Sequence, residues 1–273
     1  MRVLLDQAVD EWNSLVEREE KVAYQVQPSS SLDGQYRGEH SSSALANGNP
    51  CPPLWREKIC EWCFQVIDHC DIDRDVVSIA LSYFDRYLAH HTSIAKALYQ
   101  LVAMTSLYLA VKLHSTRKIS VSSMSALSKG QFRVDQILKI EISIIKTLRW
   151  HLNPPTPSMF LDVANPLIDH SDTDPQVSYE IVELSRYLLE LSVCDDFFAD
   201  KKSSSITYAS LLVAMDTLST PAKVKQNIGL YKLDKSPNVT QLCAQRLHHV
   251  FSLANSTESE EERAGASPTS VFQ

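Results

Sequence analysis

ALYQLVAMTSLYLAVKL, residues 97–113, is the stretch that decides the fold. As a helix it is apolar on every side except at one glutamine, at two small hydroxyl residues and at Lys112. A helix that is apolar all round either crosses a membrane or lies at the centre of a helical core. A span needs about 20 apolar residues, and an ammonium group near its end argues against one. We therefore predict a buried central helix, in which Lys112 shares the stripe of Leu101 and Thr105 and needs a partner for its charge.

Composition bounds the class of protein. The chain has 273 residues, of which 44% are hydrophobic and 22% charged, which is enough to build one or two cores. Glycine is scarce, with 6 residues, and alternating apolar and polar runs are rare, so we predict an all-α protein. The formal net charge of -7 argues against nucleic acid as a partner, and we expect no membrane binding.

The cysteines do not form the spacing of a disulfide framework or of a zinc site. Cys60, Cys63 and Cys70 lie with His69 on one predicted helix, and no second cysteine pair follows at ligand spacing. Small buried thiols are the commoner role. With no secretory signal or membrane span, we expect a reducing compartment. No glycine-rich phosphate loop or nucleophile elbow is present, so we predict neither a metal, a cofactor nor a catalytic residue.

Outward from the central stretch, the chain divides into five parts. We predict an N-terminal amphipathic helix at 1–24, a flexible Ser/Gly/Pro linker at 25–53, a first helical domain at 54–152, a second at 153–255 and a disordered acidic tail at 256–273. The run Asn153 to Pro157 is the joint between the domains, because proline restricts itself and the residue before it. The predicted helices of the two domains span 54–70, 74–89, 97–113, 121–128, 134–149, 158–168, 176–194, 203–218 and 239–254, with a short one near Val224.

The two domains carry a faint internal repeat. Residues 206–218 echo residues 101–113, and each stretch follows a helix that contains Arg-Tyr-Leu, at 86–88 and at 186–188. The echo indicates two copies of one helical unit.

Four charged residues fall on apolar faces. A buried guanidinium needs a carboxylate, and we predict that Arg56 pairs with Asp85 to hold two helices together. Lys112 and Glu141 have two interpretations: they neutralise each other inside the domain, or both lie at the rim of one surface and reach charged groups of a partner.

Several motifs in order resemble the successive helices of a cyclin: WREKICEWCFQV, YFDRYL, LYLAVKL, KIEISIIKTLRWHLNPPTPSMFL and SRYLLELSVCDDFFA, which together cover about 54–254. The resemblance implies two tandem five-helix cyclin folds, the first being the cyclin box. It also implies that Lys112 and Glu141 contact a cyclin-dependent protein kinase, and that Arg56 and Asp85 form the internal pair of the family. Leu113-His114-Ser115 stands where many cell-cycle cyclins have acidic residues that also face the kinase.

The resemblance also gives meaning to a second apolar stripe on the helix at 54–70. Cyclins that recruit kinase substrates or inhibitors use an exposed hydrophobic patch here. The matching residues are Trp55, Ile59, Trp62, Gln65, Tyr99 and Gln100. The competing interpretation is that this stripe packs under the N-terminal segment.

The function implied is a non-catalytic regulatory subunit that forms a heterodimer with a cyclin-dependent kinase and activates it in cell-cycle control, in the nucleus and cytoplasm. A transcriptional cyclin, whose kinase acts on RNA polymerase, is the near alternative. A double cyclin fold that clamps promoter DNA is a third, against which the acidic balance speaks. In the acidic tail, Ser267 precedes a proline and is a candidate phosphorylation site.

Overall fold

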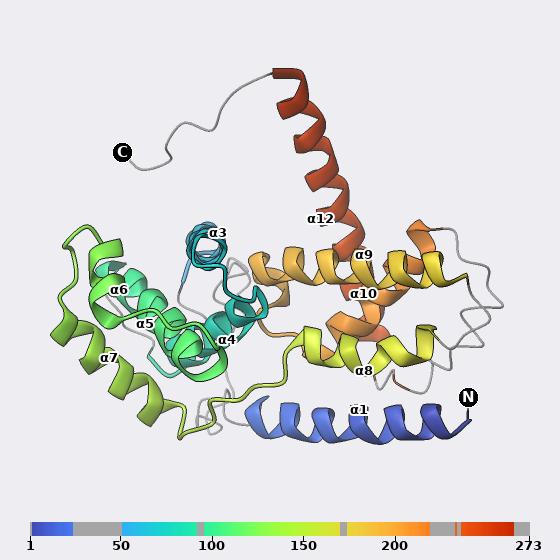
Figure 1. The fold of residues 1–273 in the computed structure, drawn as a ribbon, viewed down its shortest axis with the longest axis horizontal. Coiled ribbons are helices and arrows are strands. Elements are labelled where there is room, and N and C mark those ends of the chain that lie inside the picture. Colours follow the sequence, from blue (N-terminus) through green and yellow to red (C-terminus); the bar gives the residue numbers. More distant parts are fainter. Residues whose placement is uncertain are drawn as a thin grey trace, which may run out of the picture.

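Two helical folds lie side by side along the long axis of the molecule (Figure 1). The computed structural model describes residues 2–23, 51–91, 96–169, 174–218, 233 and 236–264. Within these residues every regular element is helical, which confirms the predicted all-α class. None of the described helices has the length and apolar character that crossing a membrane requires.

The first fold surrounds helix α5. Its members are α3 (Pro53–His69), α4 (Asp75–Ala89), α5 (Lys96–His114), α6 (Val121–Leu127) and α7 (Val134–Thr147). Helix α5 packs against the other four, and every residue from Leu101 to Val111 is buried. The prediction of a buried central helix is therefore confirmed, and burial on all sides follows from the lack of a polar face in residues 101–111.

Local signals set where these helices begin and end. Asp73 accepts a hydrogen bond from the backbone N–H of Asp75 at 2.9 Å, which satisfies a donor at the start of α4. Ser120 caps α6 by accepting from the backbone N–H of Ser123 at 3.0 Å. Helix α7 ends at Thr147, before the predicted 149, because Arg149 and Trp150 have φ angles of 48° and 63°. A left-handed backbone is incompatible with continuing an α-helix.

The second fold repeats the plan around α10. It contains α8 (Pro157–Asp169), α9 (Pro175–Cys194), a 3-10 turn η1 (Asp196–Phe198), α10 (Ser203–Thr217) and α12 (Pro237–Ala264). Helix α10 packs against α8, α9 and α12, as α5 packs against its neighbours. The two stretches that echo each other in the sequence are thus the central helices of the two folds, and the predicted tandem repeat is confirmed.

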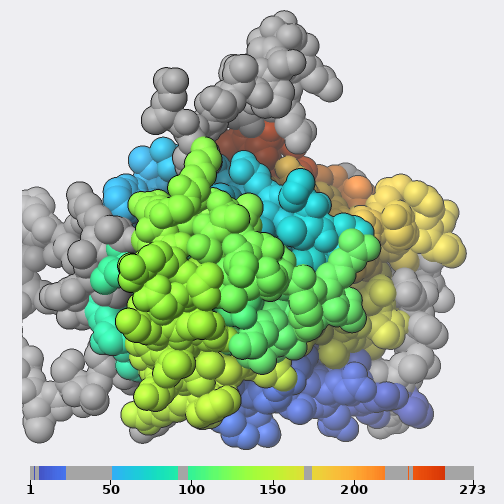
Figure 2. Space-filling view, turned by 60° about the vertical axis from the view of Figure 1, so that its left-hand side comes forward, coloured from blue at the N-terminus to red at the C-terminus, as the bar shows by residue number. Residues whose placement is uncertain are grey.

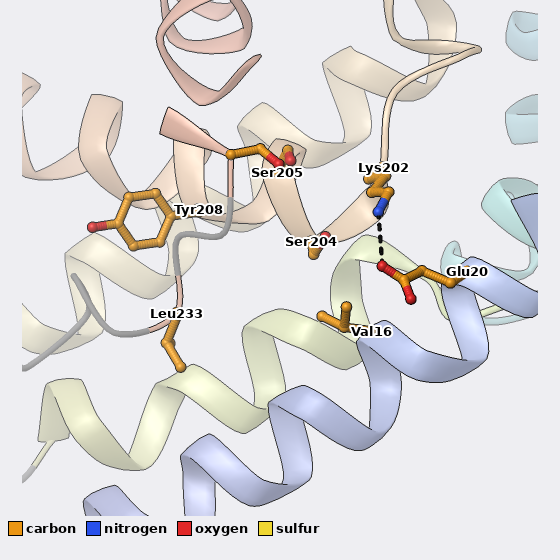
Figure 3. A pocket seen from close by; sticks show the side chains of 8 residues that line it. Val16, Glu20, Lys202, Ser204, Ser205, Tyr208 and Leu233 are labelled. Atoms are coloured by element: carbon orange, nitrogen blue, oxygen red, sulfur yellow. Dashed lines mark hydrogen bonds and ion pairs between the residues drawn. The ribbon is translucent and has the colours of Figure 1, made fainter. Parts of the chain in front are cut away.

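The N-terminal helix α1 (Arg2–Ala23) belongs to the second fold (Figure 1). It packs along α8, where Trp12 is fully buried and its ring meets that of Phe160 edge-on, with 4.7 Å between centroids. At its seam with α10, Lys202 Nζ lies 3.2 Å from Glu20 Oε1 beside a cavity of about 280 Å³ (Figure 3). Helix α1 therefore does not cover the second stripe of α3, whereas residues 24–50 lie outside the described residues.

Some predictions about the connecting segments need correction or lie outside the described residues. Helix α12 continues to Ala264 and so enters the tail predicted to be disordered from 256, because a run rich in glutamate has good helix propensity. Nearly all of the predicted linker at 25–53, the short helix near Val224 and Ser267 lie outside the described residues. The five predicted domain boundaries otherwise stay predictions.

The proline-rich joint is tied to helices on both sides. Thr156 is buried and donates its hydroxyl to Asp75 Oδ2 at 2.8 Å, so the start of α4 is held to the joint. Burial raises the pKa of the Asp75 carboxyl, and the hydrogen bond from Thr156 opposes this rise. Arg74, which directly precedes α4, also pairs with Glu190 of α9. These contacts fix the two folds relative to each other.

Candidate functional site

Lys112 and Glu141 form an ion pair between the end of α5 and the middle of α7. Lys112 Nζ donates to Glu141 Oε1 at 2.8 Å. The lysine side chain is 48% exposed, whereas the glutamate side chain is 7% exposed. The hydrogen bond to Glu141 is the largest influence on the pKa of Lys112 and raises it; burial opposes this rise, and the attraction of the Glu141 charge adds to it. The two residues neutralise each other, and the lysine end of the pair stays at the surface.

Exposed apolar side chains lie close to the residues of this pair along the same two helices. Leu113, Leu138 and Ile142 are 47%, 38% and 53% exposed. Leu138 and Ile142 are one turn apart on α7, and Leu138 is also one turn from Glu141, so the three lie on one side of that helix. Figure 2 shows α7, in yellow-green, on the face of the first fold that comes forward. Exposed apolar groups around a charged pair are typical of an interaction surface.

The exposure of Leu113, Leu138 and Ile142 was not predicted from the sequence. Leu138 follows Ile137 in an apolar run of α7, yet the structure exposes more than a third of its side chain, because the core of the first fold meets α7 at Ile137, Glu141 and Ile144. Ile142 lies off that buried stripe. A large aliphatic residue on the outer side of a helix is the sequence signal that points to such a surface.

His114 has a structural position. Its Nε2 lies 2.9 Å from Tyr83 Oη and 2.7 Å from the carbonyl oxygen of Leu152, so it links α4, α5 and the start of the joint. Of the three residues that replace the expected acidic run, Leu113 alone is an exposed large apolar group. Leu113 therefore presents an apolar side chain at a place where the resemblance leads one to expect acidic residues.

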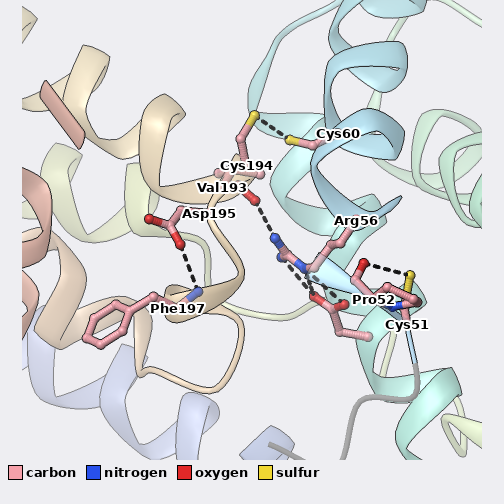
Figure 4. Close-up of polar contacts among 9 residues, drawn as sticks. Cys51, Pro52, Arg56, Cys60, Val193, Cys194, Asp195 and Phe197 are labelled. Atoms are coloured by element: carbon pink, nitrogen blue, oxygen red, sulfur yellow. Dashed lines mark hydrogen bonds and ion pairs between the residues drawn. The ribbon is translucent and has the colours of Figure 1, made fainter. Parts of the chain in front are cut away.

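Arg56 and Asp85 are paired across α3 and α4. Arg56 Nε lies 3.2 Å from each carboxylate oxygen of Asp85, and its Nη2 lies 2.9 Å from Oδ2. Its Nη1 donates to the carbonyl oxygen of Val193, on α9, at 2.8 Å (Figure 4). Burial is the largest single influence and lowers the pKa of Arg56, but the attraction and the hydrogen bonds of Asp85, together with nearby charges, raise that pKa overall. One buried guanidinium thus joins two helices of the first fold to the second fold.

A second contact between the folds lies close by. Cys60 Sγ of α3 is 2.7 Å from Cys194 Sγ at the end of α9, and both thiols are free (Figure 4). Among the described residues no group of three or more histidine, cysteine or acidic side chains is placed to hold a metal ion.

The six residues of the predicted hydrophobic patch come together only in part. Trp55 is 39% exposed, and its ring meets Tyr99 edge-on with 6.1 Å between centroids. Tyr99 is itself buried, so it supports Trp55 rather than presenting a surface of its own. Ile59 and Trp62 are half-buried, and the amides Gln65 and Gln100 are exposed. Leu98, 40% exposed and next to Tyr99 in the chain, is an apolar residue that the prediction did not include.

Comparison with known proteins identifies the family to which this double fold belongs. The sequence model of the cyclin N-terminal domain matches residues 35–153, and that of the cyclin C-terminal domain matches residues 155–267. The chain belongs to the cyclin family. Its two helical folds are therefore the two cyclin folds, and the resemblance read from its motifs is confirmed.

Curated relatives of this cyclin include cell-cycle members. It is 30% identical to the G1/S-specific cyclin-E1 of Gallus gallus over 41% of its own length and 27% of the relative. It is 28% identical to the G2/mitotic-specific cyclin-A of Patella vulgata over 60% of its length and 37% of the relative. The chain thus spans about a third of the length of these two relatives.

Solved structures share the architecture at low sequence identity. A viral cyclin from herpesvirus saimiri is matched with a TM-score of 0.64 at 16% identity, over 88% of this chain and 96% of that one. A chain of the yeast TFIIK complex is matched with a TM-score of 0.56 at 17% identity, over 86% and 93%. At these identities the likeness shows the fold alone.

Proposed function

We propose that this cyclin is a non-catalytic regulatory subunit that binds and activates a cyclin-dependent protein kinase in the control of cell-cycle progression. The observation that carries the proposal is the Lys112–Glu141 pair, set among exposed apolar side chains of α5 and α7. These two residues hold the positions through which cyclins contact their kinase. The cell-cycle members among the relatives support the cell-cycle role.

The geometry of the pair suits docking. An ammonium group has three N–H donors, and Glu141 Oε1 accepts one from Lys112. Glu141 holds the lysine in one direction, so little side-chain freedom remains to be lost when a kinase oxygen approaches. Burying the apolar area of Leu113, Leu138 and Ile142 would then supply the non-directional part of the affinity.

The departure at residues 113–115 bears on which kinase is chosen. Where many cell-cycle cyclins present carboxylates, this cyclin presents exposed Leu113 and a histidine turned toward Tyr83. A matching kinase surface would be apolar rather than basic opposite Leu113, because an unpaired basic group buried there would lose its hydration without compensation.

We also propose that the patch around Trp55 recruits substrates or inhibitors of the kinase complex. Trp55, Ile59 and Trp62 form its apolar side, and Gln65 and Gln100 supply exposed amides. An exposed tryptophan in contact with a second aromatic ring is typical of an anchor for a docked side chain. Exchange of Trp55 for alanine should weaken phosphorylation of patch-dependent substrates and leave kinase binding unchanged.

A transcriptional cyclin is the second candidate, supported by the fold shared with a chain of TFIIK. The two candidates differ in how the protein is regulated in time. Abundance followed through a synchronised division cycle separates them: oscillation supports the cell-cycle role, and a constant level supports the transcriptional one. Nuclear and cytoplasmic location is proposed for both.

Activation of a purified kinase tests the shared part of the proposal. The full chain would be added to each of a panel of purified cyclin-dependent kinases, and phosphate transfer to a protein substrate would be measured. We expect strong activation of at least one kinase and co-elution with it. Failure to bind or activate any kinase of a complete panel would contradict the proposal.

A further inference from the structure

A cavity of about 490 Å³ lies between the two cyclin folds. One wall is a face of α4 that includes Ser78, Ser82 and Arg86, which follow one another at a spacing of four residues. The prolines of the joint and the segment after η1 complete it, with Lys201 and Lys202 from the second fold. The cavity is separate from the surface around Lys112 and from the patch around Trp55.

Arg86 brings an incompletely paired guanidinium to this cavity. The residue is 4% exposed, and its Nη2 donates to the carbonyl oxygen of His151 at 3.0 Å. Its Nε and Nη1 have no hydrogen-bond partner among the described residues. Buried donors without acceptors are destabilising, and for a charged group the penalty is larger. The arrangement calls for an acceptor supplied from the cavity.

The neighbouring arginine shows what is missing. Arg56 lines the same cavity and is equally buried, but three of its N–H contacts go to Asp85 and one to Val193. Asp85 is fully engaged there and raises the pKa of Arg56. Arg86 follows Asp85 directly in the chain, yet burial lowers its pKa to about 10, and only Tyr83 opposes that effect. Arg86 is still charged at neutral pH, with no carboxylate against it.

The other charges of the cavity already have partners. Lys201 pairs with Asp200, and Lys202 pairs with Glu20. Glu19 accepts hydrogen bonds from the backbone N–H and the hydroxyl of Ser204 at 3.1 and 2.7 Å. Arg86 is therefore the cation that lacks a compensating anion among the described residues that line the cavity.

We propose that this cavity binds a phosphate group, with Arg86 as its principal ligand. A phosphate offers more acceptor oxygens than a carboxylate, and the cavity offers more donors than one carboxylate can take. Ser78 and Ser82, half-buried on the same face of α4, add hydroxyl donors. Free phosphate and a phosphorylated side chain of a partner share this chemistry. Because the site touches both folds, its occupation would stabilise their relative placement.

The test measures binding of inorganic phosphate to the full chain by calorimetry. It also measures the melting temperature in phosphate and compares it with the melting temperature in chloride at the same ionic strength. Binding to the folded state alone raises the melting temperature. We expect saturable binding that is at least tenfold weaker in Arg86→Gln. Arg133→Gln, which removes an exposed arginine outside the cavity, is the matched control and should bind as the unmodified chain does.

A second variant keeps the test decisive if Arg86→Gln does not fold. Ser82→Glu places a carboxylate one turn before Arg86 and should abolish phosphate binding while it adds stability. Absence of phosphate binding to the unmodified chain, or binding by both cavity variants as tight as that of the unmodified chain, would overturn the proposal. Equal binding of glutamate would overturn the choice of phosphate.

The source of the phosphate is decided by a further arm. O-phosphoserine amide is titrated beside inorganic phosphate on the same protein. Tighter binding of the amide identifies a phosphorylated side chain as the ligand, whereas equal or weaker binding identifies the free ion. Both results support the site.

Discussion

Lys112 shows what periodicity can and cannot predict for a single residue. Its position on the stripe of α5 predicts that it needs a negative partner, and the structure supplies Glu141 at 2.8 Å. Periodicity cannot tell that the stripe reaches the surface at this point, where the lysine side chain is 48% exposed. That depends on how far α7 extends across α5, which is a tertiary property. The pairing and the exposure together make the residue a candidate for docking.

Glu19 gives a test at the residue scale that depends on pH. Burial raises the pKa of its carboxyl above the ordinary value of 4.5, against the hydrogen bonds from Ser204. A group whose pKa is higher in the folded state binds more protons there, so the free energy of unfolding falls as pH rises through the window from the ordinary pKa to the folded pKa. Glu19→Gln removes this contribution. We expect the free energy of unfolding of Glu19→Gln, measured by urea unfolding, to fall less between pH 4.5 and 7 than that of the unmodified chain.

The neighbouring Glu20→Gln is the matched control, because the Glu20 side chain is 60% exposed. Its unfolding curves should follow the unmodified chain across the same pH range. Other half-buried carboxyls with raised pKa, including those of Asp75 and Asp196, contribute to the decline of the free energy of unfolding in every variant. Identical pH profiles for Glu19→Gln and Glu20→Gln would contradict the prediction.

At the scale of the element, helix positions follow closely from apolar spacing and from capping residues. The central helix predicted at 97–113 spans Lys96–His114, and the one predicted at 203–218 spans Ser203–Thr217. The misses have local causes, such as the left-handed Arg149 and Trp150 that end α7 early. Which face an amphipathic helix turns to a neighbour depends on the partner, so the docking of α1 on α8 could not be predicted from its sequence.

The attachment of α1 can be measured through Trp12. Its side chain is fully buried and packs edge-on against Phe160. Truncation of a buried tryptophan to alanine typically costs 3–5 kcal/mol, so we expect Trp12→Ala to lower the free energy of unfolding of the second fold by about 3 kcal/mol. Val3→Ala, on the same helix and 79% exposed, should change it by less than about 0.5 kcal/mol. Equal stabilities in chemical unfolding would show that α1 is not attached.

For the whole molecule, the sequence predicts two copies of a helical unit, but not how they are joined. The echo between 101–113 and 206–218 and the proline-rich joint are visible in the chain. The contacts that fix the folds, such as Arg56 to Val193 and Thr156 to Asp75, join residues far apart in sequence, and the first of them ends on a backbone carbonyl. Every residue has a backbone carbonyl, so a contact to one leaves no signal in the sequence. The cavity beside Arg86 lies where the two folds meet, and for the same reason it could not be predicted from the sequence.

Asp85→Ala tests the joint between the folds. It leaves the buried guanidinium of Arg56 without its carboxylate, and breaking a buried pair in this way typically costs 3–5 kcal/mol. Because the cavity at Arg86 also borders Asp85, we expect the lower end, about 3 kcal/mol, in thermal unfolding. Asp68→Ala, which breaks an exposed pair with Arg74, should cost less than about 1 kcal/mol. A loss at Asp85 no greater than at Asp68 would contradict this role.

The central claim is that the surface of Lys112 and Glu141 binds a kinase, and the most direct measurement is the affinity of Lys112→Ala/Glu141→Ala for the kinase that the unmodified chain activates. Truncation of interfacial charged groups typically costs 2 kcal/mol or more, so we predict a loss of affinity of at least about 30-fold with helicity unchanged by circular dichroism. Glu183→Ala/Arg186→Ala removes an exposed pair on α9 and should bind as the unmodified chain does. Normal binding and activation by Lys112→Ala/Glu141→Ala would contradict the account.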